Sequence, residues 1–453
     1  MRLRAFLATT LVAATASTAA FAQQAQPWIK DRRYGEGIGY RTGNLEIHPG
    51  IAGELGYDSN YFLVADDEGD KISVVRLRVT PSLSLSTLGP QRRELGGDPP
   101  KVNFRAGTFL SYNKLFATDS KNSDAVSDND HAVNAGVNFT LDVLPQRPWG
   151  FDMYGDFVRS AEPSNSIQDS LAFDRDSVRL GAGINWRPGG GLFDWRLGYE
   201  LNYNFFERDA NKRLNNYQHY LKMRGRWRFL PRTALIYDGN VGFIRYSDAT
   251  NLQHDAQVVN SKLGVNGLIT HHFAMLAMAG WAASFYDSRG GVPVHNYDGP
   301  VGQAELKWFL LPQPSLAPDQ ATVGLSSIAV GYTRDYTNSY LGDFYRRDRG
   351  YANFSYFVAG AFLVNLEGGY SYLTHSPSYF DTGALRKGSF GQSRADATLF
   401  AEYRPSDSIG VNTTFRYDAS LGNQRVPIAP GAAQQDNLQY NRYEIWLGAR
   451  WFM

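Results

Sequence analysis

Apolar and polar residues alternate along most of this chain, in short segments separated by polar links. Val75, Leu77 and Val79, for example, alternate with arginine and threonine. A period of two places all the apolar side chains of a strand on one face. The segments with this pattern are 45–57, 75–86, 102–112, 133–143, 149–157, 178–186, 193–205, 217–229, 235–243, 259–269, 273–285, 304–310, 325–332, 352–358, 362–372, 395–403, 409–417 and 437–453.

These segments predict an all-β protein of about 18 strands. After the first 22 residues, no run approaches the roughly 18 apolar residues that a membrane helix needs, and the mean hydropathy is −0.37. A transmembrane barrel gives such an average because its lipid-facing and lumen-facing residues alternate. We therefore predict an antiparallel up-and-down transmembrane β-barrel over residues 45–453, with a periplasmic β-sandwich as the alternative.

The links between the segments alternate between short and long, which favours one barrel. Outer-membrane barrels have short periplasmic turns and long extracellular loops. The alternation therefore predicts that both termini are periplasmic and that the long links lie outside the cell. The short links include 144–148, 188–191, 230–232, 270–272 and 404–407, and the long ones include 113–131, 158–176, 333–350, 373–393 and 418–437.

Six tryptophans have the apolar parity and lie beside the short-link ends of their segments. Indole rings favour the boundary between lipid tails and headgroups, so these residues are predicted to form a membrane girdle. Tyrosines gather instead at the long-link ends. The six girdle residues are Trp149, Trp186, Trp195, Trp227, Trp308 and Trp451.

The first 22 residues have the order of a secretory signal peptide. Arg2 and Arg4 precede an Ala-rich apolar run that ends in Ala20-Phe21-Ala22, an A-x-A cleavage site. The mature chain is then expected to begin near Gln23, with residues 23–44 as a periplasmic N-terminal segment. This organisation predicts the outer membrane of a Gram-negative bacterium, with outer-membrane lipid as the surroundings of the barrel.

Charge and candidate chemistry narrow the function. The formal net charge is +1, which argues against a nucleic-acid partner, and there is no cysteine. The eight histidines show no metal-ligand spacing, and His271 and His272 fall in a predicted turn. We find no catalytic motif and expect neither an enzyme nor a cofactor. Two acidic links, 66–70 and 119–130, are interpreted as solvated loop tips, with calcium sites as the alternative.

The polar parity of the segments carries many charges. Arg or Lys facing lipid at the midplane would cost about 2–4 kcal/mol, so these residues are predicted to face a polar lumen. The wall is either an anion-selective surface, strongest along residues 222–228, or a set of salt bridges that stiffens the barrel. The predicted pore-lining residues are Arg76, Arg78, Arg105, Asp152, Asp156, Arg179, Arg196, Glu200, Lys222, Arg224, Arg226, Arg228, Asp238, Lys262, Glu305, Lys307, Glu367, Arg394, Asp396, Glu402 and Arg416.

The chain ends in Gly448-Ala449-Arg450-Trp451-Phe452-Met453. This ending resembles the C-terminal assembly signal of bacterial outer-membrane barrels, with Gly448, Trp451 and Met453 at the signature positions. It differs in having Leu447 before the glycine and Met453 in place of a terminal Phe. The resemblance implies the barrel-assembly machinery as a partner.

A second motif lies where the first segment ends: Gly56-Tyr57-Asp58-Ser59-Asn60-Tyr61-Phe62, followed by Thr80-Pro81-Ser82-Leu83 in the second segment. With the signal peptide, it resembles the β-barrel porin type 2 family of outer-membrane barrels. The resemblance implies, for some members, a partnership with a periplasmic polysaccharide-export protein. The expected function is then a conduit for polysaccharide export, for which the basic segments 23–44 and 88–101 are candidate docking sites. A passive porin for small solutes and a structural or adhesive barrel are the alternatives.

Overall fold

The fold is given by a computed structural model, which describes residues 39–65, 67, 69–88, 101–119, 126, 131–161, 174–207, 209–247, 253–288, 293–310, 326–358, 361–379, 388–422, 425–426 and 436–453. The predicted signal peptide, most of the segment 23–44 and most of the link 88–101 lie outside these residues. None of the described helical stretches has the length and apolarity to cross a bilayer.

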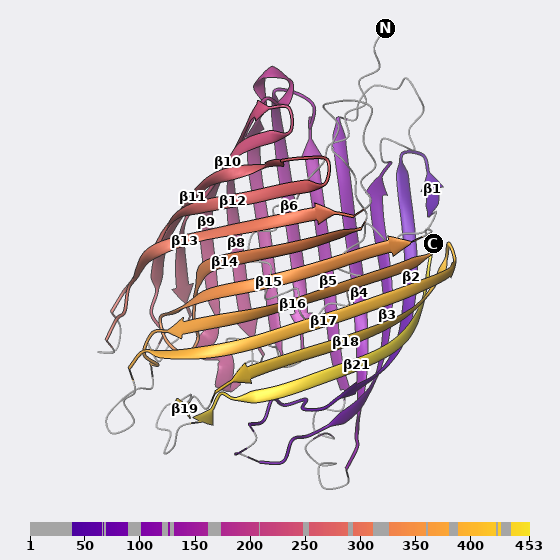
Figure 1. The fold of residues 1–453 in the computed structure, drawn as a ribbon, viewed down its shortest axis with the longest axis vertical. Helices are drawn as coiled ribbons and strands as arrows, with labels where there is room; N and C mark the ends of the chain where they lie inside the picture. The colour runs from indigo at the N-terminus through magenta and orange to yellow at the C-terminus, as the bar shows by residue number, and fades with distance from the viewer. Residues whose placement is uncertain are drawn as a thin grey trace.

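The chain forms a closed antiparallel barrel of 18 strands (Figure 1). Each strand pairs with the next along the chain, from β2 to β18, and β21 then pairs with both β18 and β2. The predicted fold and strand number are confirmed. The wall strands are β2 (Leu45–Asp58), β3 (Val74–Thr87), β4 (Val102–Ala117), β5 (His131–Val143), β6 (Trp149–Ser160), β7 (Arg175–Trp186), β8 (Phe193–Phe206), β9 (Asn216–Leu230), β10 (Thr233–Tyr246), β11 (Ala256–Leu268), β12 (Phe273–Tyr286), β13 (Tyr297–Phe309), β14 (Ser327–Asn338), β15 (Phe344–Val358), β16 (Phe362–His375), β17 (Phe390–Ser406), β18 (Ile409–Leu421) and β21 (Tyr440–Phe452).

The remaining elements are short. They are β1 (Tyr40–Thr42), the 3-10 helices η4 (Pro188–Gly191) and η5 (Asp209–Leu214), and the strand pair β19 (Arg425–Val426) and β20 (Asp436–Asn437). β1 pairs with residues 45–47 of β2, on the edge of β2 that β21 leaves uncovered beyond its end at Phe452. The expected N-terminal segment 23–44 therefore ends in a strand.

The strand ends define two ends of the barrel, here called the turn end and the loop end. The first residue of β2 and the last residue of β21 lie at the turn end, where short links such as 231–232 and 407–408 are found. The prediction of a long link over residues 333–350 is wrong. β14 and β15 include most of these residues, and the link between them is only 339–343. Alternation fades in these stretches because both faces of the hairpin carry polar residues near its tip.

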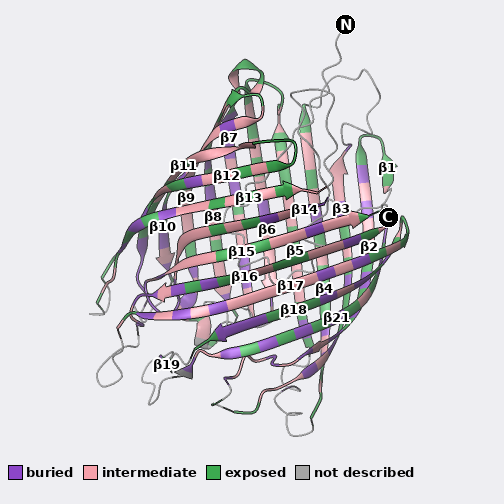
Figure 2. Cartoon of the chain, viewed as in Figure 1, coloured by how far each residue is buried: buried purple, intermediate pink, exposed green. Residues whose placement is uncertain are grey.

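Exposed and buried residues alternate along the wall strands (Figure 2). The exposed large side chains are apolar on the outer face, as with Ile51 and Leu55 of β2 or Ile445 and Leu447 of β21. A closed barrel pairs its backbone groups between neighbouring strands and leaves no open edge to lipid, and its apolar exterior suits lipid. The fold is that of a transmembrane β-barrel.

Candidate functional site

The inner face of the wall is built from ion pairs between neighbouring strands. The basic residues of β9 pair in turn with carboxylates on the two neighbouring strands. Lys222 Nζ lies 2.7 Å from Glu200 on β8, and Arg224 Nε lies 3.4 Å from Asp238 on β10. Arg226 Nη2 lies 3.3 Å from Asp194, again on β8. Three of the four positive charges over 222–228 therefore face a carboxylate, which weakens the local field that the sequence suggested.

The same arrangement continues around the barrel. Cross-strand ion pairs with short contacts occur on many of the wall strands, some of them between strands that are two apart. The further pairs are Arg179–Asp156 at 2.5 Å, Arg196–Asp152 at 2.6 Å, Arg347–Asp335 at 2.7 Å, Arg349–Asp396 at 2.7 Å, Arg78–Glu54 at 2.8 Å and Arg450–Glu402 at 2.7 Å.

Burial divides the predicted lining residues into two groups. Arg76, Arg78, Glu200, Arg394 and Glu402 have at most 9% of their surface exposed, so they are packed into the inner wall. A second group remains open to the lumen or partly so; it comprises Arg105, Asp152, Asp156, Arg179, Arg196, Lys222, Arg224, Arg226, Arg228, Asp238, Lys262, Glu305, Lys307, Glu367, Asp396 and Arg416. Whether these residues line a conducting pore stays a prediction.

Burial also differs between the two ends of the barrel. Inward residues near the loop end are buried on strand after strand, whereas Arg105, Arg224 and Glu367, farther toward the turn end, are exposed. Toward the turn end the inner face is open beside these three residues and closed on the side of β16, β17 and β21, where Leu363, Phe400, Glu402 and Arg450 are buried. The buried inward residues at the loop end include Asp58, Val74, Leu115, Ala132, Ser177, Phe206, Asn216, Ile244, Val258, Tyr286, Tyr297, Tyr345, Leu373, Gln392, Asp418 and Tyr440.

One cause of this closure is the hairpin of β14 and β15. β13 and β14 pair from Phe309 and Ser327 up to Gly302 and Arg334, where the ladder ends although both strands continue. Pro300 lies in the part of β13 that stays paired with β12 but not with β14. Proline cannot donate a ladder hydrogen bond. Beyond this point β14 stays paired with β15, so the hairpin parts from β13 as a unit.

The tip of that hairpin, residues 339–343, reaches across the mouth of the barrel. The Tyr340 ring meets the Phe206 ring of β8 edge to face, with centroids 5.6 Å apart, although β8 and β14 are six strands apart in the wall. The tip also packs on inward residues of the strands between them. The buried cluster comprises Tyr340, Phe206, Leu214, Ile244, Tyr246, Ala256, Val258 and Tyr286.

Asp343 fixes the tip to three other connections. Its carboxylate, 1% exposed, lies 2.7 Å from His254 Nδ1 and accepts hydrogen bonds from the backbone N–H of His295 at 2.7 Å and from the Tyr379 hydroxyl at 3.2 Å. These partners belong to the β10–β11, β12–β13 and β16–β17 links. A buried carboxylate with this many partners holds the tip in place, and removing it would leave their polar atoms unsatisfied.

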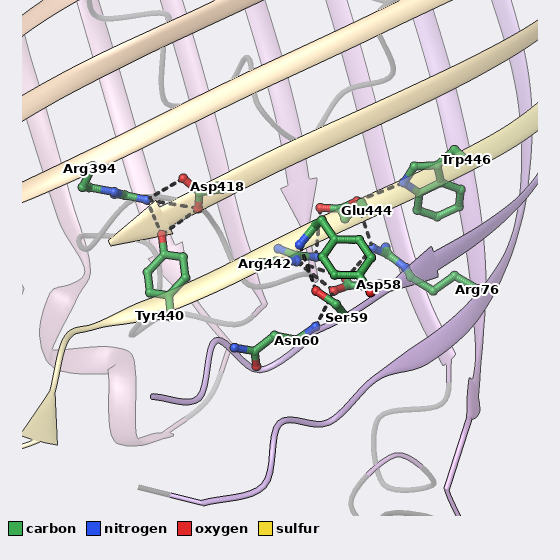
Figure 3. Close-up of polar contacts among 11 residues, drawn as sticks. Asp58, Ser59, Asn60, Arg76, Arg394, Asp418, Tyr440, Arg442, Glu444 and Trp446 are labelled. Atoms are coloured by element: carbon green, nitrogen blue, oxygen red, sulfur yellow. Dashed lines mark hydrogen bonds and ion pairs between the residues drawn. The ribbon is translucent and has the colours of Figure 1, made fainter. Parts of the chain in front are cut away.

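A second buried cluster joins the first and last strands at the loop end (Figure 3). Arg442 of β21 donates its Nε–H to Asp58 of β2 at 3.0 Å and a second hydrogen bond from Nη2. Arg76 of β3 lies 3.5 Å from the same Asp58 carboxylate and 3.7 Å from Glu444. Because β2 and β21 are 384 residues apart in the chain, this cluster clasps the seam that closes the barrel.

The motif at the end of the first strand supplies most of this clasp. Gly56 makes room for Trp446, since a Cβ there would lie 2.4 Å from the indole ring. Ser59 Oγ accepts the backbone N–H of Tyr443 at 2.9 Å, and Asn60 Nδ2 donates to the carbonyl of Asn441 at 3.2 Å. Gly56, Asp58, Ser59 and Asn60 of the motif therefore each contact a residue of β21.

Trp446 lies inside the barrel with the arginines of β3. Its ring is 1% exposed, and the guanidinium carbons of Arg76 and Arg78 lie 4.8 Å and 3.9 Å from its centroid. Cation–π contact of this kind offsets part of the cost of burying both arginines, and the carboxylates of Asp58 and Glu54 lie beside them as well. The polar face of the last segment thus includes an aromatic residue with a specific inward role.

Two more contacts extend the clasp toward the loops. Arg394 and the hydroxyl of Tyr440 both approach the Asp418 carboxylate, the hydroxyl at 2.7 Å (Figure 3). In the β2–β3 link, Asp67 accepts hydrogen bonds from Asn437 at 2.7 Å and from Arg425. These two donors, Asn437 first, hold the pKa of the Asp67 carboxyl below its ordinary value. The Asp67 contact ties this link to the β19–β20 pair.

The predicted girdle tryptophans all belong to the outward-facing parity of their strands, near the turn end. Trp149 and Trp186 stack at 6.0 Å, and Trp195 stacks on Tyr237 at 5.6 Å. Trp308 stacks with Phe273, and Trp227 lies beside Phe229. Trp451 is 42% exposed on the outer face. This placement fits a girdle, whose interfacial role stays a prediction.

The C-terminal residues close the ladder between β21 and β2. A Cβ on Gly448 would lie 2.6 Å from the Glu54 side chain, so this glycine allows a close approach of the two strands. The backbone N–H of Met453 donates to the carbonyl of Pro49 at 3.1 Å, and His48 Nδ1 lies 2.8 Å from the Met453 carbonyl oxygen. The role of these residues in assembly stays a prediction.

Among the residues that the structure describes, no group of three or more His, Asp or Glu side chains could hold a metal ion. His271 and His272 lie in the β11–β12 turn, as the sequence predicts. Asp66, Glu68 and most of 119–130 lie outside the described residues, and Asp67 is engaged by Arg425 and Asn437.

Comparison with known proteins gives similarity of fold alone. No protein-family model and no curated protein matches the chain. Among solved structures, the FrpB iron transporter from Neisseria meningitidis is similar, with a TM-score of 0.45, 8% identity, and coverage of 90% of this chain and 81% of FrpB. Pseudomonas aeruginosa OccK5 has a TM-score of 0.45 and 9% identity, with coverage of 92% of this chain and 99% of OccK5. The Bordetella pertussis alcaligin outer-membrane receptor FauA has a TM-score of 0.41 and 9% identity, with coverage of 91% of this chain and 77% of FauA. Similarities at this level say nothing about substrate, and the barrel fold rests on the strand register itself.

Sequence reasoning missed Asp343, His254 and Arg442. Asp343 and His254 are 89 residues apart and both lie in links, where no periodicity exists to place them. Arg442 precedes the clearest part of the last segment, and its partner Asp58 belongs to the quoted motif. The motif therefore marked residues of the β2–β21 cluster, although the partners of those residues on β21 could not be inferred from the sequence of β2 alone.

Proposed function

We propose that the protein is a gated conduit of the Gram-negative outer membrane, through which a polysaccharide leaves the periplasm. The observation that carries the proposal is the covered loop end of the lumen. The tip held by Asp343 packs over inward residues of β8 to β12 at that end. The inward residues Arg105, Arg224 and Glu367 are exposed toward the turn end, which we predict from its short links to face the periplasm. A cargo can enter such a barrel from the periplasm before the mouth opens.

The paired charges of the wall support a cargo that carries little charge. Because Lys222, Arg224 and Arg226 each face a carboxylate, the strongest positive ladder of the sequence is largely paired. Hydroxyl-rich chains can exchange hydrogen bonds with such a wall without displacing a counter-ion. The wall therefore suits a neutral or weakly charged saccharide better than an acidic one.

A periplasmic export protein would dock at the turn end. The basic residues Arg92, Arg93 and Lys101 in the link 88–101 are the candidate contacts, of which only Lys101 lies within the described residues. Basic segments favour an acidic partner surface. A passive porin is the second candidate, since a paired polar wall serves small hydrophilic solutes equally well; the covered mouth weighs against it.

Deleting the gene for this protein in its host distinguishes the conduit from the porin. For a conduit, surface polysaccharide should fall and periplasmic polysaccharide should rise, with both restored by the intact chain. A chain lacking 89–100 should restore neither, whereas a chain in which Arg232 of the β9–β10 turn is replaced by Ser should restore both. Unchanged surface polysaccharide, together with slower uptake of small solutes, would exclude the conduit and leave the porin.

A further inference from the structure

Tyr351 lies on the inner face of β15 and reaches across a neighbouring strand. Its cross-strand partner on β14 is Gly331, and the partner of Gly331 on the far side is Glu305 of β13. The Tyr351 hydroxyl donates to Glu305 at 2.6 Å, so the ring crosses β14 over this glycine. A Cβ on Gly331 would collide with the ring, which therefore lies close against the wall. The side of the ring turned away from Gly331 is toward the lumen.

The same arrangement across three strands recurs elsewhere in the wall. Tyr154 of β6 pairs with Gly181 of β7, and Gly181 pairs with Glu200 of β8. The Tyr154 hydroxyl donates to Glu200 at 2.5 Å, and a Cβ on Gly181 would again collide with the ring. In this copy the guanidinium of Arg196 lies over the ring, with its central carbon 5.6 Å from the ring centroid. Glycine and glutamate at these positions therefore hold a tyrosine ring against the inner wall.

The Tyr351 ring has polar neighbours on the lumen side. The ring is partly exposed, and its partner on β16 is Gly369, so neither adjacent strand places a side chain directly opposite it. Asn353 and Glu367 form the next inward pair along β15 and β16, and the Glu367 side chain is 53% exposed. The Asn353 carboxamide donates to Asn365 Oδ1 at 3.2 Å, a bond that uses neither Asn353 Oδ1 nor Asn365 Nδ2.

An aromatic ring beside amide and carboxylate groups suits a sugar ring. The C–H groups on one face of a pyranose form an apolar, slightly positive surface that fits the negative face of an aromatic ring. The hydroxyl groups of the sugar need both donors and acceptors, which carboxamides and carboxylates supply. An anionic ligand would instead meet the carboxylates of Glu305 and Glu367, and the nearby Arg349 is already paired with Asp396 at 2.7 Å. The surroundings therefore favour a neutral sugar.

We propose that Tyr351 is a stacking platform in the lumen for one pyranose ring of a neutral saccharide. Asn353, Asn365 and Glu367 bind the hydroxyl groups of the same ring. The site rests on the saccharide cargo proposed above and adds the residues that contact this cargo. Gly331 is a positioning residue, because it leaves room for the ring against the wall without contacting the sugar.

The test measures binding of maltohexaose and cellohexaose, two neutral hexasaccharides, to the purified full-length barrel in detergent by isothermal titration calorimetry. Tyr351→Ala should weaken binding by at least about five-fold, because the stacking contact is lost. Tyr351→Phe should bind within about two-fold of the intact protein, because the ring remains. Gly331→Ala should weaken binding although Tyr351 is present, because the added methyl group would displace the ring from the wall.

Tyr154→Ala and Gly350→Ala are the matched controls, and both should bind as the intact protein does. Arg196 lies over the Tyr154 ring, and nothing lies within 4 Å of a Cβ on Gly350, which precedes Tyr351 in the chain. Heat-modifiable migration confirms that each variant is folded. Equal binding by Tyr351→Ala, an equal loss in Tyr154→Ala, or no binding of either hexasaccharide to the intact barrel would each overturn the site. Surface polysaccharide after gene deletion tests the conduit separately, so failure of the site and failure of the conduit are distinguishable.

Discussion

Arg442 on the last strand and Asp58 on the first form a buried ion pair across the seam that closes the barrel. The side chains are 3% and 0% exposed. Breaking a buried pair by removing one partner leaves an uncompensated charge and costs about 3–5 kcal/mol. The seam is the one junction that the chain must form between segments made first and last, so this pair is placed where closure depends on it.

Arg442→Ala should therefore lower the free energy of unfolding by about 3–5 kcal/mol in urea titrations of barrels in lipid vesicles. Arg425→Ala is the control, because its pair with Asp67 is 45% and 40% exposed and such surface pairs contribute ~0–1 kcal/mol. Equal effects of the two substitutions would show that the seam pair has no special role.

Gly56 tests the close approach of the Trp446 ring. Gly56→Val should reduce the yield of folded barrel, because a Cβ at this position would meet the indole at 2.4 Å. Gly53→Val in the same strand should fold normally, since nothing lies within 4 Å of a Cβ there. The measurement is the fraction of heat-modifiable protein. Normal folding of Gly56→Val would contradict the packing described for Trp446.

The outer face of the last strand is predicted to matter for assembly. Trp451→Asp combined with Met453→Asp would place charge toward lipid and remove the terminal signature, so the level of heat-modifiable barrel in the outer membrane should fall several-fold. Asp407→Asn, in the β17–β18 turn, should leave it unchanged. Full levels of the double variant would remove these residues from the assembly signal.

The contact of Asp67 with the β19–β20 pair should depend on pH. Its folded-state pKa lies below the unfolded value of about 3.9, so the contribution is present above that value and is lost as the pH falls through the lower, folded pKa. Because the chain has no cysteine, spin labels at Gly69→Cys and Val426→Cys report the distance. The distance should be constant at neutral pH and broaden in acid; Asp67→Asn should remove the acid response.

The period-two pattern predicted all 18 wall strands because one face of each must meet lipid while the other meets the lumen. The pattern failed to predict strands where one face no longer meets lipid. Residues 333–338 and 344–350 were expected to be loop, yet they form the upper β14–β15 hairpin, whose faces are both polar or covered. Trp446 interrupted the pattern for a different reason: its partners are buried arginines inside the barrel.

The closed mouth could not be predicted from the sequence, although a covering by loops was a reasonable hypothesis. The contacts of Asp343 join four links of the chain, and each partner is an ordinary polar residue in its own link. Pro300 was a local sign, since a proline within a strand favours an edge or an irregularity in the ladder, although Pro49 and Pro81 also lie in wall strands. Pro300 marks the place where β14 parts from β13.

Single-channel conductance in planar bilayers tests the gated barrel most directly. The intact protein should show small or rare openings, and Asp343→Ala should open for longer and at higher conductance, because the tip loses the carboxylate that His254, His295 and Tyr379 share. Asp335→Ala should behave like the intact protein, since Asp335 pairs with Arg347 within the hairpin and binds the tip to no other link. Large, steady conductance from the intact protein, unchanged by Asp343→Ala, would contradict the account.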